Sequence, residues 1–252
     1  MIYITGDTHG NFDRIEYFCD TQKTTKNDVM IILGDVGVNY YGNKTDLRKK
    51  QWLETMPMTF MFIRGNHEMR PSKDWPIRTK ATDTYTGSFI AEPEFPSLLY
   101  MQDGRMYGLN TSDGWKKAFV IGGAYSVDKF YRLGAYAAGN HGALWFEDEQ
   151  LSPGEMDTVE KNMKMVLERE QKLDFIFTHT CPLSMEPVDM FLPQVNQDTV
   201  DQSTEVFLDK IKHMMEDENG KPTYEKWFCG HWHTDRTAPD NFRFMFKDII
   251  AL

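Results

Sequence analysis

Short apolar runs recur along the chain, and nearly all of them end in glycine or polar residues. Several are apolar throughout, a pattern that is typical of strands covered on both faces of a sheet. We therefore predict buried β-strands at these runs. They comprise residues 2–4, 29–33, 59–63, 118–121, 175–178, 227–229 and 242–246.

Three stretches between these runs repeat apolar side chains every three or four positions, which predicts amphipathic helices. The second stretch has a strong start signal: Ser152 is suited to cap a helix, Pro153 to its first turn and Glu155 to a capping box. The three stretches are marked by Phe12, Ile15, Phe18 and Cys19, by Met156, Val159, Met163, Val166 and Leu167, and by Phe207, Ile211, Met214 and Met215.

The order of these elements predicts the fold class. Strands alternate with helices early in the chain and arrive in a run later, so we predict an α/β protein with mixed sheets and helices outside. A chain of 252 residues is long enough to bury one large core, so a single domain over residues 1–252 is expected.

One stretch, at about residues 122–150, is irregular, rich in Gly, Ala and Tyr, and longer than an ordinary connection. Loops of this length in compact domains are usually functional or disordered, and the aromatic residues here disfavour disorder. We therefore predict a long, ordered insertion. Its aromatic residues include Tyr125, Phe130, Tyr131, Tyr136 and Trp145.

Charge and cysteine content narrow the functional classes. A formal net charge of -10 disfavours a general nucleic-acid binder, because binding to the phosphate backbone depends on clustered Lys and Arg. Three widely spaced cysteines form no CxxC motif, which fits a reduced compartment. The first strand starts at Ile2, and no apolar stretch approaches the roughly 20 residues of a membrane span, so we expect a cytoplasmic protein with no membrane partner.

Polar residues that often bind metals follow five of the predicted strands directly. In an α/β sheet, ligands bind at the carboxyl ends of the strands. A single histidine there is more often structural, but five of the seven histidines in the chain fall at these points. The segments are Gly6-Asp7-Thr8-His9, Gly34-Asp35, Arg64-Gly65-Asn66-His67-Glu68, His179 and Gly230-His231-Trp232-His233.

These residue types indicate a metal centre. Asp and His side chains with an Asn carbonyl suit borderline divalent ions such as Mn²⁺, Fe²⁺ or Zn²⁺, of which we favour Mn²⁺. The ligands are too many for one ion, whereas two ions roughly 3.5–4 Å apart, bridged by a carboxylate and a solvent oxygen, use them all and generate a hydroxide for phosphoryl displacement. The candidate ligands are Asp7, His9, Asp35, Asn66, His179, His231 and His233.

In order, spacing and strand-end position, these segments resemble the calcineurin-like metallophosphoesterase superfamily. The resemblance extends from residue 5 to residue 233. It implies a fold of two mixed β-sheets packed as a sandwich and flanked by helices. It also implies a dinuclear metal-dependent hydrolase of phosphodiester or phosphomonoester bonds that uses a metal-bridging hydroxide.

The resemblance further implies roles for individual residues. Asp35 bridges the two metals. His67, beside the ligand Asn66, corresponds to a catalytic histidine that contacts the substrate phosphate and assists the leaving oxygen. One ion is expected on Asp7, His9, Asp35 and His233, and the other on Asp35, Asn66, His179 and His231.

The sequence departs from the Ser/Thr protein phosphatases of the superfamily at one point. Those enzymes carry Asp-Arg-Gly soon after the second Gly-Asp, and residues 36–40 here contain no arginine. A protein phosphatase or a nucleotide phosphomonoesterase is therefore the alternative interpretation. A non-catalytic metal-binding scaffold is disfavoured, since it has no need of His67. DNA-repair nucleases of the superfamily usually have a longer chain, and the acidic charge also disfavours them.

A missing phosphate-binding arginine must be replaced from elsewhere if the substrate oxygens are to be neutralised. Lys129 and Arg132 in the insertion, and Arg64 before Asn66, are candidates, and Arg132 offers the planar fork that suits phosphate. The alternative is that Lys129 and Arg132 are solvated surface charges. The expected substrate is a phosphorylated small molecule, nucleotide or protein.

Overall fold

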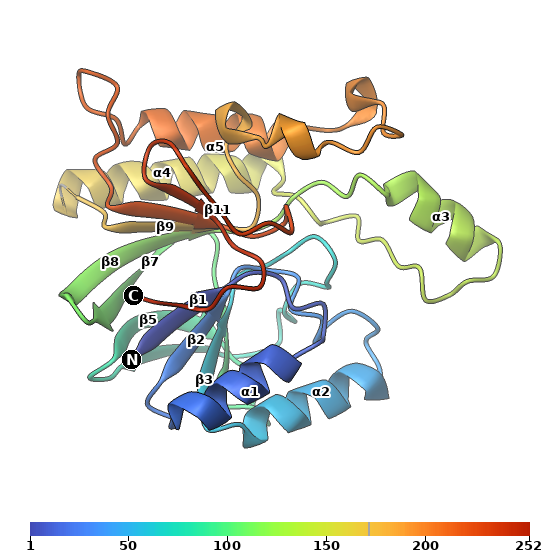
Figure 1. The fold of residues 1–252 in the computed structure, drawn as a ribbon, viewed down its shortest axis with the longest axis horizontal. Helices are drawn as coiled ribbons and strands as arrows, with labels where there is room; N and C mark the ends of the chain where they lie inside the picture. Colours follow the sequence, from blue (N-terminus) through green and yellow to red (C-terminus); the bar gives the residue numbers. More distant parts are fainter. Residues whose placement is uncertain (171) are drawn as a thin grey trace.

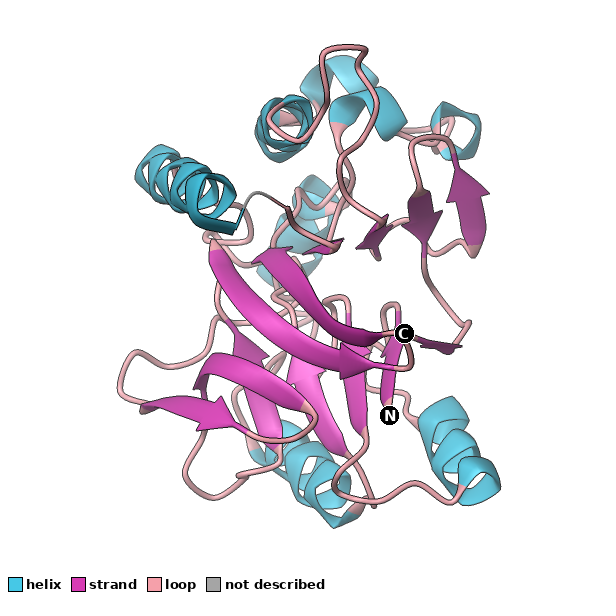
Figure 2. Cartoon of the chain, turned by 90° about the vertical axis from the view of Figure 1, so that its left-hand side faces the viewer, coloured by secondary structure: helices cyan, strands magenta, loops and turns pink. Residues whose placement is uncertain are grey.

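The computed structural model describes residues 1–170 and 172–252 and shows a mixed α/β architecture (Figure 1). Thirteen strands of this described chain join in one hydrogen-bonded sheet that curls on itself (Figure 2). The strands are β1 (Ile2–Thr5), β2 (Val29–Ile32), β3 (Thr59–Phe62), β4 (Ile77–Ala81), β5 (Tyr85–Ile90), β6 (Leu98–Met101), β7 (Arg105–Thr111), β8 (Gly114–Ile121), β9 (Phe175–Thr178), β10 (Lys226–Cys229), β11 (Arg236–Ala238), β12 (Phe242–Phe244) and β13 (Ile250–Ala251).

Two parallel halves make up the sheet. One has the order β6-β3-β2-β1 and the other β8-β9-β10-β12, and neighbours within each half run parallel. Strands β5 and β7 pair antiparallel with each other, and they also pair with β6 and β8, respectively. The family resemblance implied two mixed β-sheets packed as a sandwich. The hydrogen bonds between β5 and β7 instead make the two halves one continuous sheet.

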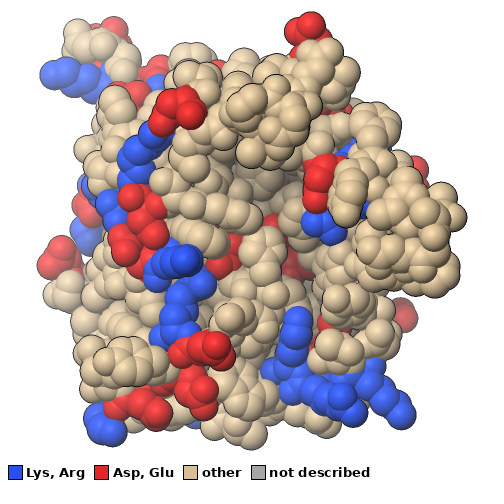
Figure 3. Space-filling view, turned by 45° about the vertical axis from the view of Figure 1, so that its right-hand side comes forward, with Lys and Arg blue, Asp and Glu red and all other residues tan. Residues whose placement is uncertain are grey.

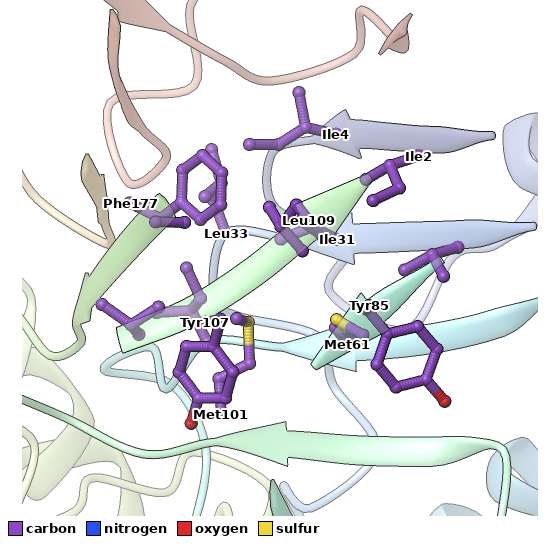
Figure 4. Packing of buried hydrophobic residues seen from close by; sticks show 14 of the residues in the cluster. Ile2, Ile4, Ile31, Leu33, Met61, Tyr85, Met101, Tyr107, Leu109 and Phe177 are labelled. Atoms are coloured by element: carbon purple, nitrogen blue, oxygen red, sulfur yellow. The ribbon is translucent and has the colours of Figure 1, made fainter. Parts of the chain in front are cut away.

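The inner faces of the two halves share one apolar core. Ile4 and Leu33, on or just after β1 and β2, belong to the same buried cluster as Phe177 on β9 and Phe228 on β10 (Figure 4). Burial of each such side chain stabilises the fold by about 1.5–3 kcal/mol. Because this core joins the two halves, it also fixes the carboxyl ends of their strands relative to one another.

Helices cover the outer faces. Helices α1 (Asp13–Gln22) and α2 (Lys44–Thr55) pack on the β1–β3 half, and α4 (Pro153–Glu170) and α5 (Ser203–His213) pack on the β8–β10 half (Figure 1). The three helices predicted from apolar spacing are confirmed as α1, α4 and α5. Helix α4 begins with the expected capping box, in which the Ser152 N–H donates to Glu155 Oε2 at 2.8 Å and the Glu155 N–H donates to Ser152 Oγ at 3.4 Å.

The insertion at residues 122–150 is more regular than predicted, since it contains helix α3 (Lys129–Ala137). No residue of α3 is buried, and the helix projects from the body of the protein (Figure 1). Phe130 and Tyr131 are among the exposed side chains of α3. The part of the surface that bulges out at the right of Figure 3 carries few charges. Helix α3 was not predicted from the sequence, because the segment is rich in glycine and alanine and has no apolar face that packs on the core.

The long connection between β9 and α5 contains three 3₁₀ helices, η1 (Leu183–Met185), η2 (Val188–Met190) and η3 (Gln197–Thr199). Together with the loops between them, these short helices lie on the same side of the sheet as α4 and α5 (Figure 1). No helix in the described ranges combines the length and apolar character needed to cross a membrane.

Candidate metal centre

The structure brings the seven predicted ligands together at one edge of the sheet. They occupy the loops that follow β1, β2, β3, β9 and β10, because parallel strands place their carboxyl ends at the same edge. We call this set the five-loop cluster. It consists of Asp7, His9, Asp35, Asn66, His179, His231 and His233.

Asp7, His9 and His233 form the more exposed part of the cluster. The Nε2 atoms of His9 and His233 are 2.9 Å apart, and they lie 3.9 and 3.2 Å from Asp7 Oδ2. The Asp7 side chain is buried, whereas those of His9 and His233 are 38% and 49% exposed. A divalent ion held by these three donors would therefore be accessible from solvent.

Asn66, His179 and His231 form the buried part. His179 Nε2 and His231 Nδ1 lie 2.8 and 3.2 Å from Asn66 Oδ1. The other ring nitrogen of His179 lies 2.7 Å from the carbonyl oxygen of Leu33, which only accepts, so Nδ1 carries the proton. With Nε2 unprotonated, both this nitrogen and the Asn66 carbonyl oxygen are acceptors, and a cation beside them would remove the repulsion between them. This donor set therefore fits a metal ion.

Asp35 lies between the two parts. Its Oδ2 is 3.9 Å from His9 Nδ1, and its Oδ1 is 3.5 Å from His179 Nε2. The same Oδ1 accepts the backbone N–H of His67 at 2.8 Å. Asp35 thus faces both histidine groups, and it also anchors the His67 loop.

The backbone of the cluster is unusual. His9, Asp35, His231 and His233 all have φ between 46° and 64°, in the left-handed region that non-glycine residues rarely adopt. Such conformations persist where the surrounding structure over-determines them, and they concentrate at functional sites. The loops also approach very closely: a Cβ on Gly65 would lie 2.1 Å from Asp35 Oδ1. Position 65 therefore requires glycine because any side chain would collide with Asp35, and not because the backbone must be flexible.

Electrostatics keep the cluster ready to bind cations. Burial opposes ionisation of Asp7, but the hydrogen bond with His233 and the charges of nearby histidines outweigh it and hold the pKa of Asp7 well below its usual value. Burial lowers the pKa of His231 to about 3, with a further contribution from the charge of His179. At neutral pH the cluster therefore presents an ionised carboxylate beside a neutral imidazole.

Two residues that the sequence analysis did not identify orient Asn66. The Asn66 Nδ2–H donates to Ser126 Oγ at 2.8 Å, and the Ser126 hydroxyl donates to Glu149 Oε2 at 2.5 Å. All three side chains are buried. This chain fixes the amide so that its oxygen faces the histidines. Ser126 lies shortly after the predicted strand at 118–121, but no local signal connects it or Glu149 to Asn66.

Comparison with known proteins agrees with this arrangement. The family model for calcineurin-like phosphoesterases matches residues 1–235. The chain belongs to the calcineurin-like phosphoesterase family. A search of curated proteins finds no match for this family member. Among solved structures, the chain is similar to a phosphopantetheinyl hydrolase from Mycobacterium tuberculosis, with 14% sequence identity and a TM-score of 0.43 over 97% of this chain and 87% of that chain.

In this calcineurin-like phosphoesterase, His67 lies next to the cluster. Its ring centroid is 6.0 Å from that of His9, and its Nδ1 is buried without a hydrogen-bond partner among the described residues. Burial lowers the pKa of His67 despite the charge of Asp35. The ring is therefore neutral at neutral pH.

The three basic residues proposed to bind phosphate all have other partners. Arg64 is buried and donates to Asp103 Oδ2 at 3.2 Å and to the carbonyl oxygen of Glu149 at 2.7 Å. Lys129 Nζ lies 4.1 Å from the ring centroid of Trp145. Arg132 donates to Asp128 Oδ2 at 2.7 Å and to the Tyr40 hydroxyl at 2.8 Å. These contacts hold the insertion in place, and a role in phosphate binding stays a prediction.

A cavity of about 400 Å³ opens beside the cluster. Asp35, Asn66, His67, His231 and His233 line one side of it. The other side is formed by the connection between β9 and α5, by the first turn of α5 and by the start of the insertion. The phosphoesterase thus has room for an organic group next to its candidate metal ligands.

Proposed function

We propose that the protein is a metal-dependent phosphoester hydrolase with two divalent ions in the five-loop cluster. One observation supports this most strongly: seven candidate donor residues from five loops converge, and Asn66 Oδ1 lies 2.8 and 3.2 Å from ring nitrogens of His179 and His231. Family membership supports the same conclusion.

The proposed ligand sets follow the two parts of the cluster, with Asp35 shared between them because its two oxygens face different histidines. Mn²⁺ is the favoured ion, since mixed carboxylate, amide and imidazole donors without cysteine suit it. The first set is Asp7, His9, Asp35 and His233, and the second is Asp35, Asn66, His179 and His231.

Divalent ions bound there supply a Lewis acid for the phosphoryl group and make water a stronger nucleophile. The chain's own residues orient and complete the site. Asn66 is held by Ser126, and Asp35 holds the backbone of His67. The His67 ring lines the cavity, where it is placed to hold a proton at the leaving oxygen.

The proposed substrates are phosphorylated organic molecules, nucleotides or phosphorylated protein segments rather than nucleic acids. The net charge of -10 supports this choice, because a nucleic acid would be repelled outside the immediate site.

Metal reconstitution tests the proposed function. The full chain is stripped with chelator, titrated with Mn²⁺, Fe²⁺ or Zn²⁺, and assayed for metal content and for hydrolysis of p-nitrophenyl phosphate and bis(p-nitrophenyl) phosphate. We expect close to two ions per chain and recovery of hydrolysis. Full activity with a single ion at saturation would disprove the dinuclear centre, and no hydrolysis of either ester with any ion would disprove the function.

Two histidine variants sharpen this test. His233→Ala removes a donor from the exposed part and should reduce bound metal. His213→Ala is the matched control, because His213 is an exposed histidine whose Nδ1 lies 2.7 Å from Glu216, outside the cluster. Equal metal loss in the two variants would show that histidine content, rather than the cluster, accounts for binding.

A further inference from the structure

The cavity beside the cluster has a second, apolar side. We call it the apolar wall; it is formed by Met190, Phe191, Leu192, Val195, Val200 and Trp232. The Phe191 and Trp232 rings stack with centroids 5.9 Å apart and planes inclined by 18°. A wall of this kind binds the hydrocarbon part of a ligand rather than a phosphate.

The charged groups at this cavity are acidic. No lysine or arginine lines it among the described residues, whereas Asp128, Glu186 and Glu205 do. Asp128 is paired with Arg132, and Gln202 Nε2 donates to both oxygens of Glu186, at 3.2 and 3.1 Å. Asp128 Oδ1 and Glu205 Oε2 are both buried without a hydrogen-bond partner among the described residues, but Asp128 is already paired with a cation through its other oxygen and Glu205 is not.

Glu205 is a buried acid with an unused oxygen. Its residue is 4% exposed, and Oε1 accepts the hydroxyl of Thr180 at 2.9 Å. Oε2 is buried and has no hydrogen-bond partner in the described part of the chain. Burial, together with the smaller effect of the negative charges of Glu186 and Asp201, raises the pKa of Glu205 to about 7 although hydrogen bonds to its own backbone N–H and to Thr180 lower it.

The position of Glu205 in the chain explains only part of this. It lies in the first turn of α5, where the helix dipole favours an acidic side chain. That placement does not require the side chain to be buried against a cavity with one oxygen unpaired. A buried, unpaired carboxylate oxygen is costly, and a bound cationic donor would remove the cost.

The lack of basic residues at the cavity also limits how much negative charge a bound phosphoryl group can carry. Arg64, Lys129 and Arg132 are all engaged elsewhere, and none lines the cavity. A phosphodiester carries one negative charge where a monoester carries nearly two, so it needs less positive charge from the protein. The site therefore suits a diester whose second ester group occupies the cavity.

We propose that the cavity binds the second ester group of a phosphodiester, a short apolar chain ending in an ammonium group, with Glu205 Oε2 accepting from the ammonium and Phe191 and Trp232 packing against the chain. This inference rests on the proposed hydrolase function and names the substrate class of the same site.

Two diesters with the same leaving group test it. The metal-loaded full chain is assayed at pH 8 with p-nitrophenyl 2-aminoethyl phosphate and with p-nitrophenyl propyl phosphate, which differ by an ammonium in place of a methyl group. We expect kcat/KM to favour the aminoethyl ester by at least about tenfold, as for a charge-assisted hydrogen bond. In Glu205→Gln the ratio should fall by about tenfold or more, and the intrinsic reactivity of the esters cancels in this comparison with the wild type.

Glu186→Gln is the matched control. It removes an acid from the same cavity whose two oxygens are already bonded to Gln202, so the ratio should change by less than about twofold. An equal fall of the ratio in both variants would show that the general negative field selects the substrate, and it would overturn the assignment to Glu205. Phe191→Ala should lower kcat/KM for both diesters and preserve their ratio.

The outcomes separate the two proposals. A wild-type ratio within twofold of one, with the propyl ester hydrolysed, would overturn the inference and leave the hydrolase function standing. No hydrolysis of these diesters, p-nitrophenyl phosphate or bis(p-nitrophenyl) phosphate with any of the three metals would overturn the function itself. The wild-type ratio requires no variant, so the inference remains testable even if Glu205→Gln does not fold.

Discussion

The five-loop cluster and the apolar wall enclose the same cavity and differ in their physical character. The cluster consists of polar side chains on short loops with left-handed backbone at four positions, and Ser126 and Glu149 support it from behind. The apolar wall includes residues of a connection with three short 3₁₀ helices, and Met190 and Leu192 in it are 37% and 49% exposed. A reacting phosphoryl group needs fixed geometry, whereas an organic group needs apolar surface.

Two buried acids show the same contrast. Asp7 in the cluster is 1% exposed, and Glu205 beside the apolar wall is 4% exposed. Burial opposes ionisation of both, yet the pKa of Asp7 is lowered because histidines face it, and that of Glu205 is raised to about 7 because no cation does. Burial alone therefore does not decide the charge of an acid in this protein; its partners do.

Substitution of Asp35 should have the largest effect. Asp35→Asn removes the charge that faces both parts of the cluster, so we expect loss of both metals and of measurable hydrolysis. Elemental analysis of the reconstituted variant checks this. Retention of one ion at full occupancy would mean that Asp35 serves only one part, and the description of the cluster as one shared centre would be wrong.

Substitution of His67 should separate chemistry from metal binding. His67→Gln removes the ring beside the cluster and should lower kcat by about 10²–10⁴, the range for general acid–base residues, with metal content nearly unchanged. Steady-state kinetics and elemental analysis on the same sample measure both. If the variant instead loses an ion, His67 is a ligand.

Removal of the support behind Asn66 should weaken metal binding without abolishing catalysis. Ser126→Ala leaves the Asn66 amide unheld, and we expect metal affinity to fall by about 10–100-fold, as for other groups that orient a ligand. Excess Mn²⁺ should restore activity. Ser184→Ala is the control, because Ser184 also donates to a carboxylate, Asp209, at 2.6 Å. Unchanged affinity in Ser126→Ala would show that the amide needs no support.

The smallest effect concerns the acid beside the apolar wall. The pKa of Glu205 in the folded protein, about 7, exceeds the usual 4.5, so the folded state holds the proton more tightly and the wild type loses stability as pH rises from 4.5 through 7. Glu205→Gln avoids this loss. The Tm of the variant minus the Tm of the wild type should therefore be several degrees larger at pH 8 than at pH 5. Thermal unfolding at the two pH values measures it. A difference independent of pH would show that Glu205 is ionised normally.

Local pattern was sufficient to predict the strands that carry the five-loop cluster and to identify its candidate ligands. Apolar runs predicted β1, β2, β3, β9 and β10, and the polar residues after them were identified because strand ends in an α/β sheet meet at one edge. The capping signal at Ser152 likewise identified the start of α4. In each case the deciding interaction lies within a few residues or follows from a repeating pattern.

The tertiary structure alone decided the features that join distant segments. The bond from Asn66 to Ser126 spans 60 residues, and that between His179 and Leu33 spans 146. The pairing of β5 with β7 joins the two expected sheets into one. Glu205 becomes a buried acid with an unpaired oxygen only because α5 packs beside the loop after β9. Such features depend on which surfaces meet after folding. The sequence by itself therefore determined which residues are candidate metal ligands, and the packing of the two sheet halves decided how these residues are oriented and which side chains line the cavity beside them.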